Sequence, residues 1–227
     1  MDKQRLVQTA RALVAKGKGI LAADESSGTI KRRFDSINVE STEDNRRNYR
    51  EMLFRTASVD EFISGVILFD ETIRQNGAAG DPLVQVLLNQ GVIPGIKVDN
   101  GTQPLPGAPN ETVTGGVDGL ADRLKDYASL GARFTKWRAA ITVSQDTPTR
   151  YCIDTNAHAL ARFAALCQEA SLVPIVEPEV LIDGSHSIER SFQVTQHAQQ
   201  TVFEALADQG VDLRGIVLKP SMVISGA

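Results

Sequence analysis

Short apolar runs recur along the chain, and each of them ends in an ionisable residue. The six runs span residues 19–24, 65–70, 95–99, 132–136, 173–177 and 215–219. Their last residues are Asp24, Asp70, Asp99, Lys136, Glu177 and Lys219. Continuous apolar runs of this length are typical of parallel strands that are covered on both faces of a sheet. We therefore predict six buried strands.

Helical patterns separate these strands. Apolar positions at helical spacing predict helices from Val117 to Ala128, from Leu160 to Cys167 and over residues 188–208. Asp44 is expected to cap a further helix, whose apolar positions include Tyr49, Leu53 and Ala57. Alternation of strands and helices implies βαβ units and a parallel sheet.

The spacing of the strands favours a (β/α)8 barrel over a doubly wound open sheet. The polar positions Lys97, Lys136, Glu177 and Lys219 are separated by 39, 41 and 42 residues. Each interval is about one βα unit of a barrel. No glycine-rich dinucleotide or P-loop motif follows any strand, as it would in many open sheets. Ionisable residues at the ends of strands also agree with a barrel, which carries its chemistry there.

The chain contains six predicted strands rather than the eight of a closed barrel. A six-stranded arc would leave two exposed edges, which proteins usually avoid. We therefore expect residues 1–227 to form a single, incomplete barrel domain, and we expect the natural protein to continue through strands seven and eight.

Composition narrows the class of protein. Of the 227 residues 42% are hydrophobic, which is enough for a sizeable core in one domain, and the net charge of −4 argues against a nucleic-acid-binding surface. No window is apolar enough for a membrane span or a signal peptide. Cys152, just before a helical pattern, and Cys167, within it, are expected to be reduced thiols of a cytoplasmic protein.

Three lysines lie inside or at the end of apolar strands. Lys97, Lys136 and Lys219 either reach solvent and pair with carboxylates, or serve in amine catalysis. Desolvation and a second nearby cation both favour the neutral, nucleophilic amine. If the strands curve together, Lys136 and Lys219 face one pocket. One of them would then form an imine with a ketone while the other stays cationic.

Carboxylates accompany these lysines. Glu177 ends a predicted strand, and Pro178 is expected to stop that strand. A carboxylate beside two lysines can shuttle protons during imine formation, although a salt bridge that neutralises Lys136 explains Glu177 equally well. Asp24 is either the structural partner of a lysine or a group that orients substrate.

Two further patterns carry weaker chemical information. Residues 25–33 combine hydroxyls, a glycine and three basic residues, which suits a phosphate site but also a helix cap followed by a solvated basic turn. The only histidines, His158, His186 and His197, do not show the spacing of metal ligands, so we predict no metal site.

These residues and their neighbours closely resemble class I fructose-bisphosphate aldolases over essentially the whole chain. The matching stretches are GKGILAADESSGTIKRRF (17–34), GVILFDETIRQ (65–75), PGIKVDNGTQPLPG (94–107), GARFTKWRAAI (131–141), VPIVEPEVLIDG (173–184) and GIVLKPSMVISG (215–226). The resemblance implies reversible cleavage of fructose 1,6-bisphosphate to dihydroxyacetone phosphate and glyceraldehyde 3-phosphate in glycolysis. It implies a lysine Schiff base, no metal or other cofactor, phosphorylated ketose and triose substrates, and a homotetramer.

The resemblance also implies roles for single residues. Lys219 matches the Schiff-base lysine, and Glu177 matches the general acid/base of imine formation and of C3–C4 cleavage. Lys136 and Arg138 match a charged pair near the reacting centre, and Glu179 matches the carboxylate that positions these cations.

Asp24 matches an aspartate that contacts substrate hydroxyls. Lys97, Ser26 and Thr29 match positions near the phosphate distal to the ketone. Family members continue through strands that bind the other phosphate and through a C-terminal tail, so we expect a polypeptide of residues 1–227 alone to be poorly stable and inactive. The alternatives are a Schiff-base aldolase of the transaldolase type and a non-catalytic scaffold.

Overall fold

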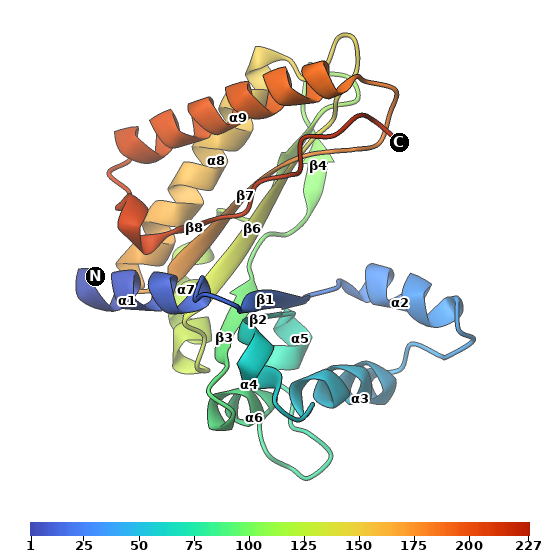
Figure 1. Ribbon diagram of the computed structural model, residues 1–227, viewed down its shortest axis with the longest axis vertical. Helices are drawn as coiled ribbons and strands as arrows, with labels where there is room; N and C mark the ends of the chain where they lie inside the picture. The colour runs from blue at the N-terminus through green and yellow to red at the C-terminus, as the bar shows by residue number, and fades with distance from the viewer.

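The computed structural model describes residues 1–227, and its centre is a curled sheet of six parallel strands (Figure 1). The strand order is β1-β2-β3-β6-β7-β8, so the strands lie in the sheet in the order in which they occur along the chain, and helical crossovers join them. The strands are β1 (Gly19–Ala23), β2 (Ile63–Leu68), β3 (Ile93–Lys97), β6 (Phe134–Ile141), β7 (Val173–Val180) and β8 (Val217–Leu218). This sheet is a half-barrel, which confirms the predicted partial (β/α)8 architecture.

Helices connect the strands and cover the outer face of the sheet. They are α1 (Lys3–Leu13), α2 (Ser27–Asp35), α3 (Glu43–Phe54), α4 (Val59–Phe62), α5 (Asp70–Ile73), α6 (Leu83–Asn89), α7 (Leu120–Ser129), α8 (Arg150–Glu169), α9 (Ile188–Asp208) and the 3-10 turn η1 (Leu213–Gly215). The long helices α8 and α9 pack side by side against β6 and β7 (Figure 1). A separate hairpin of β4 (Thr102–Pro104) and β5 (Thr112–Thr114) leads into α7. None of the helices combines the length and apolarity needed to cross a lipid bilayer.

Side chains alternate between the two faces of each strand, as the two-residue period of a strand requires. On β6, Trp137 points outward into the main hydrophobic core and stacks on Phe163 of α8 at 5.4 Å between ring centroids. Phe134, three residues earlier in β6, belongs instead to a second cluster inside the half-barrel. Lys136 and Arg138 lie on this inner face as well, because they follow Phe134 by two and four residues.

Helix α1 closes the amino-terminal end of the half-barrel. Its buried positions Leu6, Ala10 and Leu13 recur at helical spacing and join Phe134 and strand residues of β2 and β7 in the inner cluster. The sequence analysis proposed no helix here, although these three positions follow the helical period. The contact with the sheet therefore supplies the stability that this short segment lacks by itself.

Three local predictions were wrong. Helix α3 is capped by Thr42 rather than Asp44, since the Thr42 hydroxyl accepts from the Asn45 backbone at 3.1 Å. Helix α8 begins at Arg150, so Cys152 lies within it. Strand β7 does not stop at Pro178 but runs to Val180. The Val176 carbonyl accepts from the Lys219 backbone N–H, so the backbone groups of every second residue of β7, including Pro178, point toward β8. Because β8 ends at Leu218, no hydrogen bond between β7 and β8 is lost where Pro178 lacks an N–H.

Gly95 makes room for the buried ring of Phe134, its register partner on the neighbouring strand. A Cβ at position 95 would overlap that ring, which is fully buried and has no free space to enter. We expect Gly95→Ala to lower the free energy of unfolding by about 1–3 kcal/mol through overpacking. Urea unfolding followed by circular dichroism measures this change. Gly19→Ala is the matched control, because nothing lies within 4 Å of its added Cβ, and an equal loss in both variants would contradict the packing argument.

Candidate active site

Strands β6 and β7 place two cations opposite two carboxylates on the inner face of the half-barrel. In the strand register Lys136 lies opposite Ile175, and Arg138 lies opposite Glu177. The ion pairs are diagonal, however. Lys136 Nζ lies 3.2 Å from Glu177 Oε2, and Arg138 pairs with Glu179. Each cation thus meets the carboxylate two residues further along β7, within the reach of long side chains on diagonal positions.

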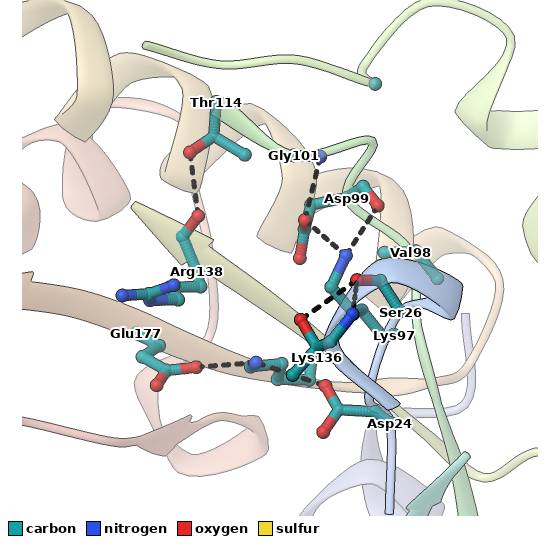
Figure 2. Close-up of polar contacts among 12 residues, drawn as sticks. Asp24, Ser26, Lys97, Val98, Asp99, Gly101, Thr114, Lys136, Arg138 and Glu177 are labelled. Carbon is teal, nitrogen blue, oxygen red and sulfur yellow. Dashed lines mark hydrogen bonds and ion pairs between the residues drawn. The ribbon is translucent and has the colours of Figure 1, made fainter. Parts of the chain in front are cut away.

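Lys136 lies at the centre of this arrangement and is only 7% exposed. Its Nζ donates to Asp24 Oδ2 at 3.2 Å and lies at the same distance from Glu177 (Figure 2). Asp24 follows β1, which is separated from β6 by two other strands in the sheet order. Only the curvature of the sheet brings these two side chains together.

The two carboxylates determine the charge of Lys136. Burial lowers the pKa of the Lys136 ammonium, but the charges of Asp24 and Glu177 raise this pKa more, so the net shift is upward. These contacts favour the cationic form of Lys136. We expected Lys219 to lie near Lys136 and to disfavour its charge. The closest charged neighbours of Lys136 are instead the two anions Asp24 and Glu177.

Lys219 reaches the same carboxylate from the other side. Its backbone N–H donates to the Val176 carbonyl at 2.9 Å, which extends the β7–β8 pairing by one residue and places Lys219 beside Glu177. The Lys219 ammonium contacts Glu177 Oε1. Glu177 is only 3% exposed, whereas the Lys219 side chain is 50% exposed. One buried carboxylate thus bridges two lysine amines, with one oxygen for each.

A cleft of about 1000 Å³ opens beside Lys136 at the carboxyl ends of the strands. Asp24, Lys136 and Arg138 line it, together with Ser26, Thr29 and Lys97 from the candidate phosphate region. Glu177, Glu179 and Lys219 are not among its lining residues. Glu177 is connected to the cleft through its ion pair with Lys136.

Lys97, at the end of β3, is held by the loop that follows it (Figure 2). Its ammonium donates to the Asp99 carboxylate at 2.6 Å and to the Asp99 carbonyl at 3.0 Å. The same carboxylate oxygen accepts from the Gly101 backbone, while the other, Asp99 Oδ2, is buried without a hydrogen-bond partner. Lys97 is thereby fixed at the cleft wall next to its own counter-charge.

Ser26 and Thr29 form the helix cap that was one of the two interpretations of residues 25–33, and they also face the cleft. Ser26 caps α2 by accepting from the Thr29 backbone at 3.4 Å, and the two hydroxyl oxygens lie 3.1 Å apart. Of the basic residues that follow, Arg33 pairs with Glu25 and lines the cleft, whereas Lys31 pairs with Asp35 on the surface.

The cleft also contains residues that the sequence analysis did not propose for the site. These are Asp70, Arg74, Asp99, Arg123 and Tyr127, among others. Asp70 and Asp99 end apolar runs just as Asp24 does, so the same criterion would have selected them. Arg123 and Tyr127 lie on α7, and no local pattern marks them. The Tyr127 hydroxyl donates to Asp70 at 2.8 Å, a contact between residues 57 positions apart.

The three histidines do not gather with other ligands. No group of three or more histidine, cysteine, aspartate or glutamate side chains is arranged to hold a metal ion. The two cysteines are free and buried, and burial raises the pKa of the Cys152 thiol to about 11.

Comparisons with known proteins cover almost all of this sequence. The family model described as fructose-bisphosphate aldolase class-I, glycolytic, matches residues 5–227. The probable fructose-bisphosphate aldolase class 1 of Xanthomonas campestris pv. campestris is 55% identical over 226 residues, which are 100% of this chain and 68% of that protein. Fructose-bisphosphate aldolase 4, cytosolic, of Arabidopsis thaliana is 52% identical over 98% of this chain and 56% of its own length.

A solved structure agrees with these sequence matches. Fructose-bisphosphate aldolase from Plasmodium falciparum, in complex with TRAP and a small molecule inhibitor, superposes with a TM-score of 0.97 at 51% identity. The match covers 98% of this chain and 65% of that one. The chain thus spans between 56% and 68% of the length of these three proteins.

Proposed function

Because the chain belongs to the class I fructose-bisphosphate aldolase family, we propose that it cleaves fructose 1,6-bisphosphate reversibly through a Schiff base on Lys219. The products are dihydroxyacetone phosphate and glyceraldehyde 3-phosphate. The observation that carries this proposal is the Glu177 carboxylate, which contacts the Lys219 amine with one oxygen and Lys136 with the other.

We assign the proton transfers of imine formation to Glu177, which contacts the Lys219 amine. Its Oε1 accepts a proton from the Lys219 ammonium, and the freed lone pair of Nζ attacks the C2 carbonyl carbon of the ketose. Protonation of the resulting carbinolamine hydroxyl lets it leave as water, and the C2=N⁺ bond forms. Lys136 begins the cycle protonated, since its two carboxylate neighbours raise its pKa.

Cleavage then uses the positive imine as an electron sink. A carboxylate removes the proton of the substrate 4-hydroxyl, and the aldehyde product forms as the C3–C4 bond breaks. The electron pair of that bond moves to the imine nitrogen and leaves an enamine on Lys219. Protonation at C3 and hydrolysis of the imine release the second product. We assign the C3–C4 proton transfer to Glu177 and contacts with the substrate hydroxyls to Asp24.

The cleft supplies charge for the phosphates. Its lining cations are Arg33, Arg74, Lys97, Arg123, Lys136 and Arg138, and its lining carboxylates are Asp24, Glu25, Asp70 and Asp99. We assign Ser26, Thr29 and Lys97 to the phosphate distal to the ketone. Arg138, anchored by Glu179, completes the positive side of the reacting centre. The reaction needs no metal and no other cofactor.

Family membership also supports three coarser proposals. The protein acts in the cytoplasm, as the name of its Arabidopsis relative states for that protein. It assembles as a homotetramer. Residues 1–227 form a single domain that contains six strands of a (β/α)8 barrel.

Borohydride trapping of the full-length protein tests the proposed reaction. Hydride reduces a C=N⁺ bond to a stable secondary amine, so dihydroxyacetone phosphate should add covalent mass to the peptide that contains Lys219. Peptide mass spectrometry locates the adduct. An adduct from a sedoheptulose phosphate but not from fructose 1,6-bisphosphate would indicate a transaldolase-type reaction. No adduct with any of these sugars would overturn the Schiff-base proposal in favour of a scaffold.

A further inference from the structure

A buried arginine outside the cleft reaches the loop that carries Asp24. Arg50 lies on α3 and has an exposed fraction of 0%. One of its guanidinium nitrogens donates to the backbone carbonyl of Glu25 at 2.8 Å. That carbonyl belongs to the residue between Asp24 and Ser26. A side chain from a helix outside the sheet thus holds the turn after β1.

The same guanidinium connects this turn to α5, the short helix that follows β2. A second nitrogen of Arg50 lies 3.5 Å from Glu71 Oε2, and the group lies 5.7 Å from the ring centroid of Phe69. The Glu25 carboxylate is 4.0 Å away. Burial lowers the pKa of Arg50 in spite of Glu25 and Glu71, which raise it, yet an arginine keeps its charge near neutral pH.

Burial of the charged Arg50 guanidinium removes it from water, which disfavours the folded state. Two of its nitrogens, Nε and one Nη, lack a hydrogen-bond partner. We expect a cation that is buried in this way to fix the positions of the groups around it rather than to stabilise the fold. The geometry in question is the turn at 24–26, which directs Asp24 toward Lys136 and Ser26 toward the cleft.

We infer that Arg50 is a positioning residue, which holds the Glu25 carbonyl and thereby fixes the Asp24 carboxylate against Lys136 across the half-barrel. This inference rests on the proposed Schiff-base reaction, in which Asp24 contacts the substrate. Arg50 acts only through the turn and does not itself line the cleft.

The geometry requires an arginine at this position. The planar guanidinium offers donors in several fixed directions, so it bonds to the Glu25 carbonyl and faces Glu71 at the same time. A lysine keeps the charge but presents a single ammonium on a flexible stem. Arg50→Lys should therefore release the turn while it preserves the net charge of the protein.

Arg46 provides a matched control on the same helix. It pairs with Glu71, as Arg50 does, and it donates to the Ser41 carbonyl at 2.6 Å, but it has no contact with the turn after β1. Arg46→Lys perturbs the same carboxylate by the same chemical change. Its effect on activity should be independent of Asp24.

A double-mutant cycle on the full-length protein tests the inference. We expect Arg50→Lys to lower kcat for fructose 1,6-bisphosphate cleavage by roughly 10–100-fold, the range that a displacement of about 1 Å produces. In an Asp24→Asn background the same change should lower kcat by less than about 3-fold, because the displaced group is already removed. Arg46→Lys should have the same small effect in both backgrounds. All rates are measured below the thermal midpoint of each variant.

The outcomes separate this inference from the proposed function. If the wild type gives the Lys219 adduct but Arg50→Lys lowers kcat equally in both backgrounds, Arg50 is merely structural and the inference is wrong. If the wild type gives no adduct, the proposed reaction fails first. If Arg50→Lys does not fold, Glu71→Gln is used in the same cycle, since it removes the anion that Arg50 faces. Coupling of Glu71→Gln to Asp24→Asn supports the inference, and additivity overturns it.

Discussion

Replacing Lys219 with methionine is expected to abolish covalent trapping and to lower the rate of cleavage by at least about 10⁴-fold. The thioether cannot form an imine, so the electron pair of the C3–C4 bond has no acceptor. A decrease of this size in the rate is typical when the nucleophile of a covalent mechanism is removed. The fold should persist, because the Lys219 side chain is half-exposed and Glu177 keeps its contact with Lys136. Single-turnover assays and peptide mass spectrometry measure the two effects.

Lys97→Met is the matched control for Lys219. Lys97 also ends a strand of the same sheet, but its ammonium contacts Asp99 rather than Glu177. We expect this variant to keep the adduct on Lys219 and to lose affinity for the phosphorylated substrate. An adduct that persists in Lys219→Met, or one that forms on another lysine in the wild type, would contradict the assignment of the Schiff base.

Replacing Glu177 with glutamine should lower kcat by about 10²–10⁴-fold, the usual contribution of general acid–base catalysis. The amide has the shape of the carboxylate but cannot take the proton of the Lys219 ammonium. It also leaves the buried Lys136 with Asp24 as its one remaining ion-pair partner. Borohydride should still trap the adduct on Lys219, but more slowly. Pre-steady-state trapping at several quench times measures this rate.

Glu179→Gln separates the role of Glu177 from that of a nearby charge. Glu179 lies two residues further along β7, on the same face, and pairs with a partly exposed Arg138. Because that pair is more exposed to solvent, its loss should matter less. We expect kcat to fall by less than about 10-fold. If the two glutamine variants lose the same activity, the proton-transfer role of Glu177 is wrong.

The sequence alone was sufficient for the sheet. All six apolar runs became strands of one parallel sheet, and residues 188–208 became α9. Long apolar runs and regular helical spacing are local signals, so they survive without knowledge of the tertiary structure. Arg138 and Glu179 were proposed only from the family resemblance, and the structure brings them to the same pair of strands as Lys136 and Glu177.

The partners of those residues depended on the tertiary structure. Glu177 pairs with Lys136, although the strand register places Arg138 directly opposite Glu177. The curl of the sheet brought Asp24 across two strands to Lys136, and packing against the sheet stabilised α1. Sequence periodicity specifies the face on which a side chain lies. It does not specify which side chains from distant segments meet, because that depends on how those segments pack. The anions that raise the pKa of Lys136 and the Arg50 guanidinium that reaches the turn beside Asp24 are both contacts of this kind.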